Sequence, residues 1–108
     1  MVLRLTVVSA GDEPLPPGTP LRIELRDTSY ADAPAKLLKR VDTTVARKGR
    51  TTTVAVSMDE HLPDGTTVWA HNDVDRDGRV SKGDFLSMES YPVTSATRTI
   101  TIRLRKVT

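Results

Sequence analysis

Hydrophobic and polar residues alternate along several short segments of the chain. Leu3, Leu5 and Val7 are separated by Arg4 and Thr6, and the same period of two recurs further along. In a β-strand this period places apolar side chains on one face and polar side chains on the other. We therefore predict strands whose inner faces are formed by Leu3, Leu5 and Val7, by Leu21, Ile23 and Leu25, by Thr52, Val54, Val56 and Met58, and by Ile100, Ile102 and Leu104.

Three other segments have a less regular pattern. Residues 66–72 predict a strand centred on Val68, Trp69 and Ala70, and residues 85–93 are expected to be extended. Residues 37–45 are compatible with a helix or a strand, but their β-branched residues and the preceding Pro34 favour a strand. Residues 47–50 contain three basic residues and Gly49, and this segment predicts a solvated hairpin turn into the next strand.

About seven short strands separated by Gly, Pro and Asp predict an all-β protein. We expect one domain over residues 1–108, a two-sheet antiparallel β-sandwich, with a small open β-barrel as the alternative. Prolines at 16, 17, 20 and 34 and the charged residues of 37–45 mark the neighbouring segments as candidate sheet edges. Trp69 is expected in the core.

The composition excludes several classes of function. The chain has no cysteine, which excludes disulfides, thiol catalysis and cysteine-borne lipid anchors in this sequence. A net charge of +2 and four scattered aromatic residues predict no nucleic-acid surface. No apolar run is long enough for a membrane span or a secretory signal, so we expect either a cytoplasmic protein or one whose leader is replaced by Met1. The charged outer faces predict a monomer.

The chemistry of the chain is concentrated in residues 73–84. Asp73, Asp75 and Asp77 occupy alternate positions, Gly78 follows them, and Asp84 lies eleven residues after Asp73. This spacing is typical of a calcium loop, in which alternating carboxylates converge on one cation and a glycine permits the sharp turn. The predicted calcium ligands are Asp73, Asp75, Asp77, Asp84, the Arg79 carbonyl and Ser81, directly or through water; the alternative is an acidic loop without an ion.

The segments around this loop do not have a helical pattern, so we expect a calcium loop within a β scaffold rather than a sensor that opens. Asp84 replaces the longer glutamate that usually closes such a loop, and Arg76, Arg79 and Lys82 offset its charge, so the predicted site is weak and structural. His71 and His61 lack zinc-ligand spacing, and His71 is expected to be a partly exposed strand residue.

Two segments resemble a known family. They are Leu15-Pro16-Pro17-Gly18-Thr19-Pro20-Leu21-Arg22-Ile23-Glu24-Leu25-Arg26-Asp27-Thr28-Ser29 with Ala31-Asp32-Ala33-Pro34-Ala35, and Ser90-Tyr91-Pro92-Val93. They resemble the YbaY-like, or YscW-type, bacterial lipoprotein domain. The resemblance implies an exported, usually lipid-anchored β-sandwich without catalytic residues, related to small chaperone-like lipoproteins of type III secretion. The chain has no lipobox cysteine, and the aspartate-rich loop is not a general feature of that family.

These observations predict a non-catalytic, calcium-binding β-sandwich that presents a surface. No nucleophile elbow or phosphate loop is present, so we do not expect an enzyme. Two alternatives remain, namely a pilotin-like or chaperone-like secretion accessory protein that binds a partner peptide, and an accessory module of an enzyme. The resemblance favours the cell envelope or the extracellular space.

Overall fold

The seven predicted strands are all present in the computed structural model, which describes residues 2–29, 33–58 and 61–108. The strands are β1 (Val2–Ser9), β2 (Pro20–Asp27), β3 (Lys36–Thr44), β4 (Thr52–Ser57), β5 (Thr66–Asn72), β6 (Phe85–Ser87) and β7 (Thr99–Lys106). The segment over residues 37–45, which was compatible with two structures, is a strand. Residues 31 and 32 of the family resemblance lie outside the described residues.

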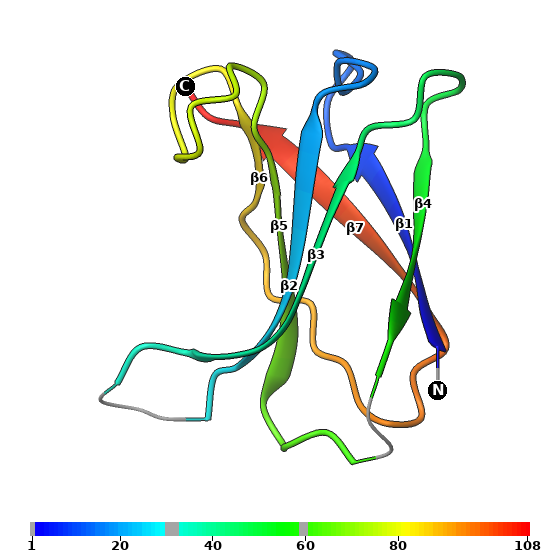
Figure 1. The fold of residues 1–108 in the computed structure, drawn as a ribbon, viewed down its shortest axis with the longest axis vertical. Helices are drawn as coiled ribbons and strands as arrows, with labels where there is room; N and C mark the ends of the chain where they lie inside the picture. Colours follow the sequence, from blue (N-terminus) through cyan, green and yellow to red (C-terminus); the bar gives the residue numbers. More distant parts are fainter. Residues whose placement is uncertain (1, 30–32, 59–60) are drawn as a thin grey trace.

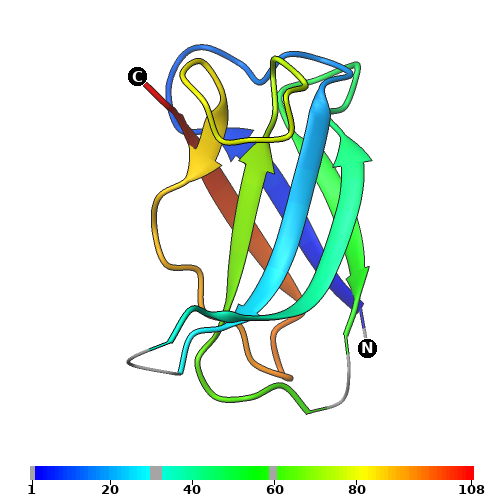
Figure 2. The ribbon, with the colours of Figure 1, turned by 60° about the vertical axis from the view of Figure 1, so that its left-hand side comes forward.

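All seven strands form one curled sheet in the order β3-β2-β5-β6-β7-β1-β4 (Figures 1 and 2). The small open barrel therefore describes the architecture. In a simple meander all six neighbouring pairs of strands would be antiparallel, but here β1 and β7 pair in parallel, with Leu5 opposite Ile100 and Val7 opposite Ile102. The first and last strands are thus adjacent inside the sheet, next to the edge strand β4, a pairing that the sequence pattern did not predict.

The inside of the curled sheet holds the core. Leu3, Leu5, Val7, Ile102 and Leu104 have no exposed surface, as their alternation predicted. Strands β2 and β4 contribute their own alternating apolar residues to the same cluster. Trp69 is an exception, because Val68 and Ala70 point inward on β5 and leave Trp69 on the outer face, where the Arg26 guanidinium stacks 4.1 Å from its ring. The prediction that Trp69 lies in the core was wrong.

The sheet remains open between β3 and β4, its two edge strands. Among the described residues, β3 pairs only with β2, and β4 pairs only with β1. The prediction that residues 47–50 form a hairpin turn was therefore wrong, because the strands before and after them belong to opposite edges of the sheet. Of the predicted edges, β3 is one, whereas β2 lies between β3 and β5.

Candidate functional site

The aspartate-rich loop connects β5 to β6 at the end of the barrel that also carries the chain's C-terminus (Figure 1). Its start is held by the beginning of β2, because the Asp73 N–H donates to the Pro20 carbonyl and the amide of the preceding Asn72 donates to Thr19 and Pro20. Its last residues are held by the segment after β7, because the Gly83 N–H donates to the Val107 carbonyl and the Val107 N–H donates to the Asp84 carbonyl. Both ends of the loop are thus fixed to the scaffold.

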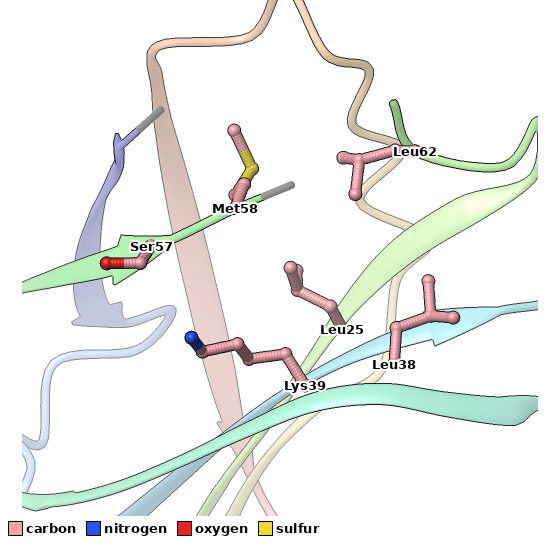
Figure 3. Close-up of a pocket in the computed structure, with 6 residues that line it drawn as sticks. All are labelled: Leu25, Leu38, Lys39, Ser57, Met58 and Leu62. Atoms are coloured by element: carbon pink, nitrogen blue, oxygen red, sulfur yellow. The ribbon is translucent and has the colours of Figure 1, made fainter. Parts of the chain in front are cut away.

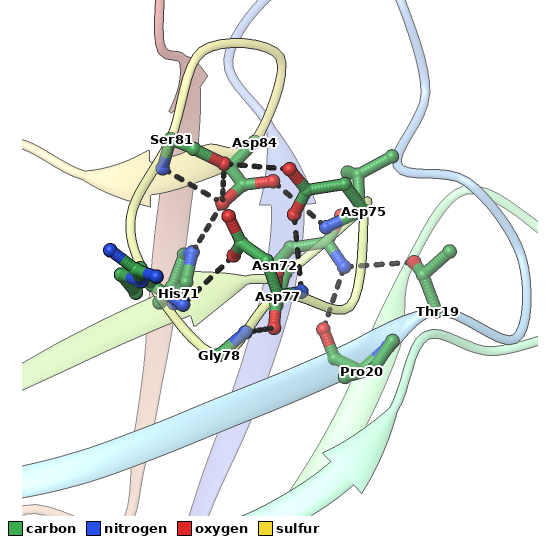
Figure 4. Close-up of polar contacts among 12 residues, drawn as sticks. Thr19, Pro20, His71, Asn72, Asp75, Asp77, Gly78, Ser81 and Asp84 are labelled. Carbon is green, nitrogen blue, oxygen red and sulfur yellow. Dashed lines mark hydrogen bonds and ion pairs between the residues drawn. The ribbon is translucent and has the colours of Figure 1, made fainter.

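The turn inside the loop places successive aspartates around backbone N–H groups. Asp73 Oδ2 accepts from the Gly78 N–H at 2.8 Å, and Asp77 Oδ1 accepts from the Arg79 N–H at 2.9 Å. Gly78 has a φ of 78°, a conformation that glycine adopts without steric cost. Through these hydrogen bonds the loop backbone turns around the carboxylates of its own aspartates (Figure 4). Carboxylate oxygens of Asp73, Asp75, Asp77 and Asp84 all lie within 4.8 Å of one another.

Asp84 forms the buried base of this cluster. It has no exposed surface, and its Oδ1 accepts from the Val74 N–H at 3.0 Å. Its Oδ2 accepts from the Ser81 N–H at 3.1 Å and lies 2.8 Å from His71 Nε2 (Figure 4). The oxygens of Asp84 are therefore oriented by three neighbours, and the loop is built around this carboxylate.

The carboxylates have unequal electrostatic surroundings. Burial raises the pKa of Asp73, and the nearby carboxylates of Asp75, Asp84 and Asp77 add to this effect. The Ser81 hydroxyl donates to Asp75 Oδ2 at 2.9 Å and lowers the pKa of Asp75. Asp73 Oδ1 is buried and has no hydrogen-bond partner in the part of the chain that the structure describes. A buried carboxylate oxygen without a donor is unfavourable, and a cation or a proton would stabilise it.

The structure brings most of the predicted ligands together. The four aspartates converge, and the Ser81 hydroxyl contacts both Asp75 and Asp84. The sixth predicted ligand, Arg79, is an exposed residue of the loop whose backbone N–H donates to Asp77. The loop therefore has the donor set of an oxygen-ligated cation site.

His71 was considered in the sequence analysis and set aside as a partly exposed strand residue, and that prediction was wrong. It is 3% exposed rather than partly exposed, because the loop folds over the outer face of β5 and covers it. Its ring nitrogen lies within 4.8 Å of carboxylate oxygens of Asp73 and Asp84. No motif contains this trio, since His71 and Asp84 are thirteen residues apart and meet only through the pairing of β5 with β6.

A second feature of functional interest is the gap between the edge strands. The strands lie nearest each other at the end joined by residues 45–51 and splay apart toward the other end (Figure 1). A cavity of about 110 Å³ lies at the splayed end, lined by Leu25, Leu38, Lys39, Ser57, Met58 and Leu62 (Figure 3). Leu25 and Met58 belong to the core, so the cavity connects the gap to the apolar interior.

Comparison with solved structures identifies the class of fold. The chain is similar to an alternative pilotin from the type II secretion system of Vibrio cholerae, with a TM-score of 0.72, 22% sequence identity, and coverage of 100% of this chain and 97% of that one. The chain therefore has a pilotin-like fold. Neither the comparison with protein families nor that with curated proteins finds a match. Among the described residues, no helix has the length and apolar character needed to cross a membrane.

Proposed function

We propose that this protein is a non-catalytic accessory protein of the cell envelope that acts by binding a protein partner, as a pilotin-like component of a secretion system. The observation that carries the proposal is the agreement of the whole chain with a solved pilotin, over 100% of its length at a TM-score of 0.72. The resemblance of residues 15–35 to YbaY-like lipoproteins supports the same location, and we infer membership of that family from it.

The open edge of the sheet supports this proposal physically. Natural sheets usually cover, shorten or charge their edges, because unpaired backbone groups attract other strands, and of these protections β3 has the charge. Here β3 is nine residues long and lies beside a gap that leads to the core. A surface of this kind is suited to a peptide partner, because an added strand gains backbone hydrogen bonds and a place for an apolar side chain.

Photo-crosslinking in the cells that naturally produce the protein tests this proposal. The positions are Val2, Leu37, Val80 and Met88, large apolar residues with 48%, 51%, 46% and 52% exposure on different parts of the surface. Replacing each in turn by benzoylphenylalanine should give a discrete adduct with one envelope protein from at least one position. Absence of any protein adduct from all four positions, with the variants folded and present in the envelope fraction, would contradict the proposal.

Calcium binding by the aspartate-rich loop is a second candidate function. It is favoured by the convergence of four carboxylates and by the buried Asp73 oxygen without a donor. Asp73, Asp75, Asp77 and Asp84 would hold the ion, with Ser81 beside them and the Arg79 carbonyl as the predicted sixth ligand. The ion would stabilise the loop and have no catalytic role. Free calcium outside cells is high enough to fill a weak site of this type.

Scanning calorimetry in the presence of a chelator and then of excess calcium tests the ion site. At about a hundredfold excess over the dissociation constant, binding should stabilise the fold by about 2.7 kcal/mol, which raises Tm by several degrees. Magnesium should have a smaller effect, because it loses its water ligands reluctantly. Asp77→Ala should abolish the shift and keep a β-type circular dichroism spectrum, whereas Asp12→Ala, outside the loop, should keep the shift. Identical transitions with and without calcium would exclude the site.

A further inference from the structure

The two edge strands leave backbone groups available for a further strand. In the described parts of the chain, no strand pairs with the free side of β3 (Lys36–Thr44) or with that of β4 (Thr52–Ser57). Because the edges splay apart away from the 45–51 connection, the first half of β3 is the more accessible part (Figure 1). Backbone N–H and C=O groups at such an edge can pair with an extended peptide.

The cavity at the splayed end has the size of one aliphatic side chain. A closed apolar cavity of about 150 Å³ can hold a benzene ring, so the 110 Å³ present here accommodates a smaller group. Leu25, Leu38, Met58 and Leu62 supply its apolar wall (Figure 3). A peptide paired with the first half of β3 would pass beside this opening, and one of its apolar side chains could enter.

Lys39 gives the cavity a charged rim. Its partner in the β2–β3 ladder is Leu25, whose side chain points into the core, and residues paired across a ladder lie on the same face of the sheet. Lys39 therefore stands on the inner face of an edge strand, beside the cavity (Figure 3). Within the described ranges it has no carboxylate partner, whereas the neighbouring Arg40 is paired with Asp42. A ligand that fits this site supplies an apolar group and a negative charge.

The segment that contains this edge has a strongly positive net charge. Residues 36–50, which form β3 and the connection after it, contain six basic residues and one acidic residue and so carry a charge of +5. The whole chain carries only +2, so the remainder carries −3. The acidic residue of the segment, Asp42, is already paired with Arg22 and Arg40. An acidic partner is therefore attracted to this edge and a basic one is repelled from it.

We propose that an extended, acidic peptide segment of the partner adds to β3 as a further strand, with one aliphatic side chain in the cavity and a carboxylate against Lys39. This inference rests on the proposed function and specifies where the partner binds and what its chemistry is. The backbone ladder supplies part of the affinity, and the cavity and Lys39 supply the selection of side chains.

Fluorescence anisotropy with two labelled decapeptides tests the inference on the full chain. One peptide alternates leucine with glutamate, and the matched peptide alternates leucine with lysine. The glutamate peptide should bind, and the lysine peptide should bind at least about tenfold more weakly. Equal binding of the two, or binding of neither, would overturn the inference.

Variants of the edge separate this site from general charge attraction. Lys39→Glu should weaken binding of the glutamate peptide by about tenfold or more, whereas Arg103→Glu, the same charge change on an exposed residue of β7, should have a much smaller effect. Leu38→Trp, which fills the cavity, should also weaken binding. Equal losses for Lys39→Glu and Arg103→Glu would overturn the inference, with circular dichroism used to verify that each variant is folded.

Hydrogen exchange identifies the mode of binding. The amides of residues 36–44 should exchange more slowly in the complex, and unchanged exchange with the peptide bound would overturn strand addition.

Sedimentation with phosphatidylglycerol vesicles tests whether the basic edge binds a membrane surface instead of a peptide. Vesicle binding that depends on Lys39, without binding of the glutamate peptide, would overturn the inference and assign the edge to a membrane surface. If photo-crosslinking finds a protein partner while the glutamate peptide fails, this inference is overturned and the proposed function stands.

Discussion

Four aspartates in one loop have four different environments, and these differences determine what each can do. Asp84 is buried and fully hydrogen-bonded, Asp75 is stabilised by the Ser81 hydroxyl, and Asp77 accepts one backbone N–H in the exposed part of the loop. Asp73 alone combines a buried oxygen without a donor with a raised pKa. Asp73 is therefore the carboxylate that a bound cation stabilises most. Without a cation, its negative charge is also the most destabilising of the four.

Asp73→Asn should raise Tm in the presence of a chelator and abolish the response to calcium. The asparagine oxygen can still accept from the Gly78 N–H, while its amide can donate to the neighbouring carboxylates. Two unit charges 4 Å apart repel by about 1 kcal/mol even in water, so the expected gain in stability is of that order. Calorimetry of the variant beside Asp12→Asn measures it. A Tm below that of the wild type in chelator would show that the Asp73 charge is stabilising.

A second residue-scale prediction concerns Asp27 at the end of β2. Its Oδ1 accepts from the Ser29 hydroxyl at 2.6 Å and from the Ser29 N–H at 3.0 Å, and these bonds lower the pKa of Asp27. A lowered pKa in the folded state means that the ionised form contributes stability above the ordinary pKa of an aspartate, and that this contribution is lost as the pH falls through the lowered value.

Ser29→Ala should therefore raise the pKa of Asp27 toward its ordinary value and reduce the loss of stability in acid. Thr28→Ala is the matched control, because the Thr28 hydroxyl donates to the Gly65 carbonyl instead. Carboxyl titration by NMR measures the pKa in each protein. An Asp27 pKa that shifts as much in the control as in Ser29→Ala would contradict this assignment.

At the scale of elements, the connections decide how the strands meet. Gly65 lies in the turn before β5, where its carbonyl accepts from the Thr28 N–H and hydroxyl just after β2. Its φ is 86°, and a Cβ built there would lie 3.2 Å from Ser29 Cβ and from the Ser29 backbone nitrogen. Gly49, between β3 and β4, has a similar φ of 80°, but none of the described residues beyond its chain neighbours has an atom within 4 Å of such a Cβ. A side chain at either position would strain the backbone, but only at Gly65 would it also contact a neighbouring residue. Comparison of the two positions therefore distinguishes the cost of backbone strain from the cost of the close contact.

Gly65→Ala should destabilise the fold more than Gly49→Ala. Both substitutions place alanine in the left-handed region, at a cost of about 1–2 kcal/mol, and Gly65→Ala adds a close contact with Ser29. Urea unfolding monitored by circular dichroism gives the two free energies of unfolding. Equal losses would indicate that the turn shifts away from Ser29 without cost.

At the scale of the whole molecule, an open barrel has to keep its edges from pairing with other copies of itself. Edge strand β3 carries Lys36, Lys39 and Arg40, and Lys39 is on the inner face of the sheet, a device that discourages edge-to-edge pairing. In a self-paired arrangement of two β3 strands, the +5 segments of both copies would be brought together. Like charges at such an interface oppose association.

The protein should therefore be a monomer at neutral pH with or without calcium. Light scattering at several concentrations measures the mass directly. Lys39→Val, which removes the inward charge, should increase association at high concentration, and Arg103→Val on β7 should not. A dimer of the wild type that persists on dilution would contradict the prediction and would show that an edge pairs with a second copy.

The local pattern of the sequence was sufficient for the strands, for most of the core and for the acidic loop. Alternation marked Leu3, Leu5 and Val7 as buried because side chains on a strand alternate regardless of which strands are neighbours. The aspartate spacing at residues 73–77 also indicated which carboxylates converge, since their contacts lie within one loop. Local physics determines these features, so a single sequence contains the information.

Only the tertiary structure decided which strands are neighbours and what lies against them. The parallel pair of β1 and β7, the separation of β3 from β4, and the outward position of Trp69 all depend on how the sheet curls. The contact of His71 with Asp84 arises from the β5–β6 pairing, and the position of Lys39 beside the cavity arises from the β2–β3 register. Strand pairing joins residues far apart in the chain, and its free energy comes from the packing of the whole core, which the period of a single segment does not encode.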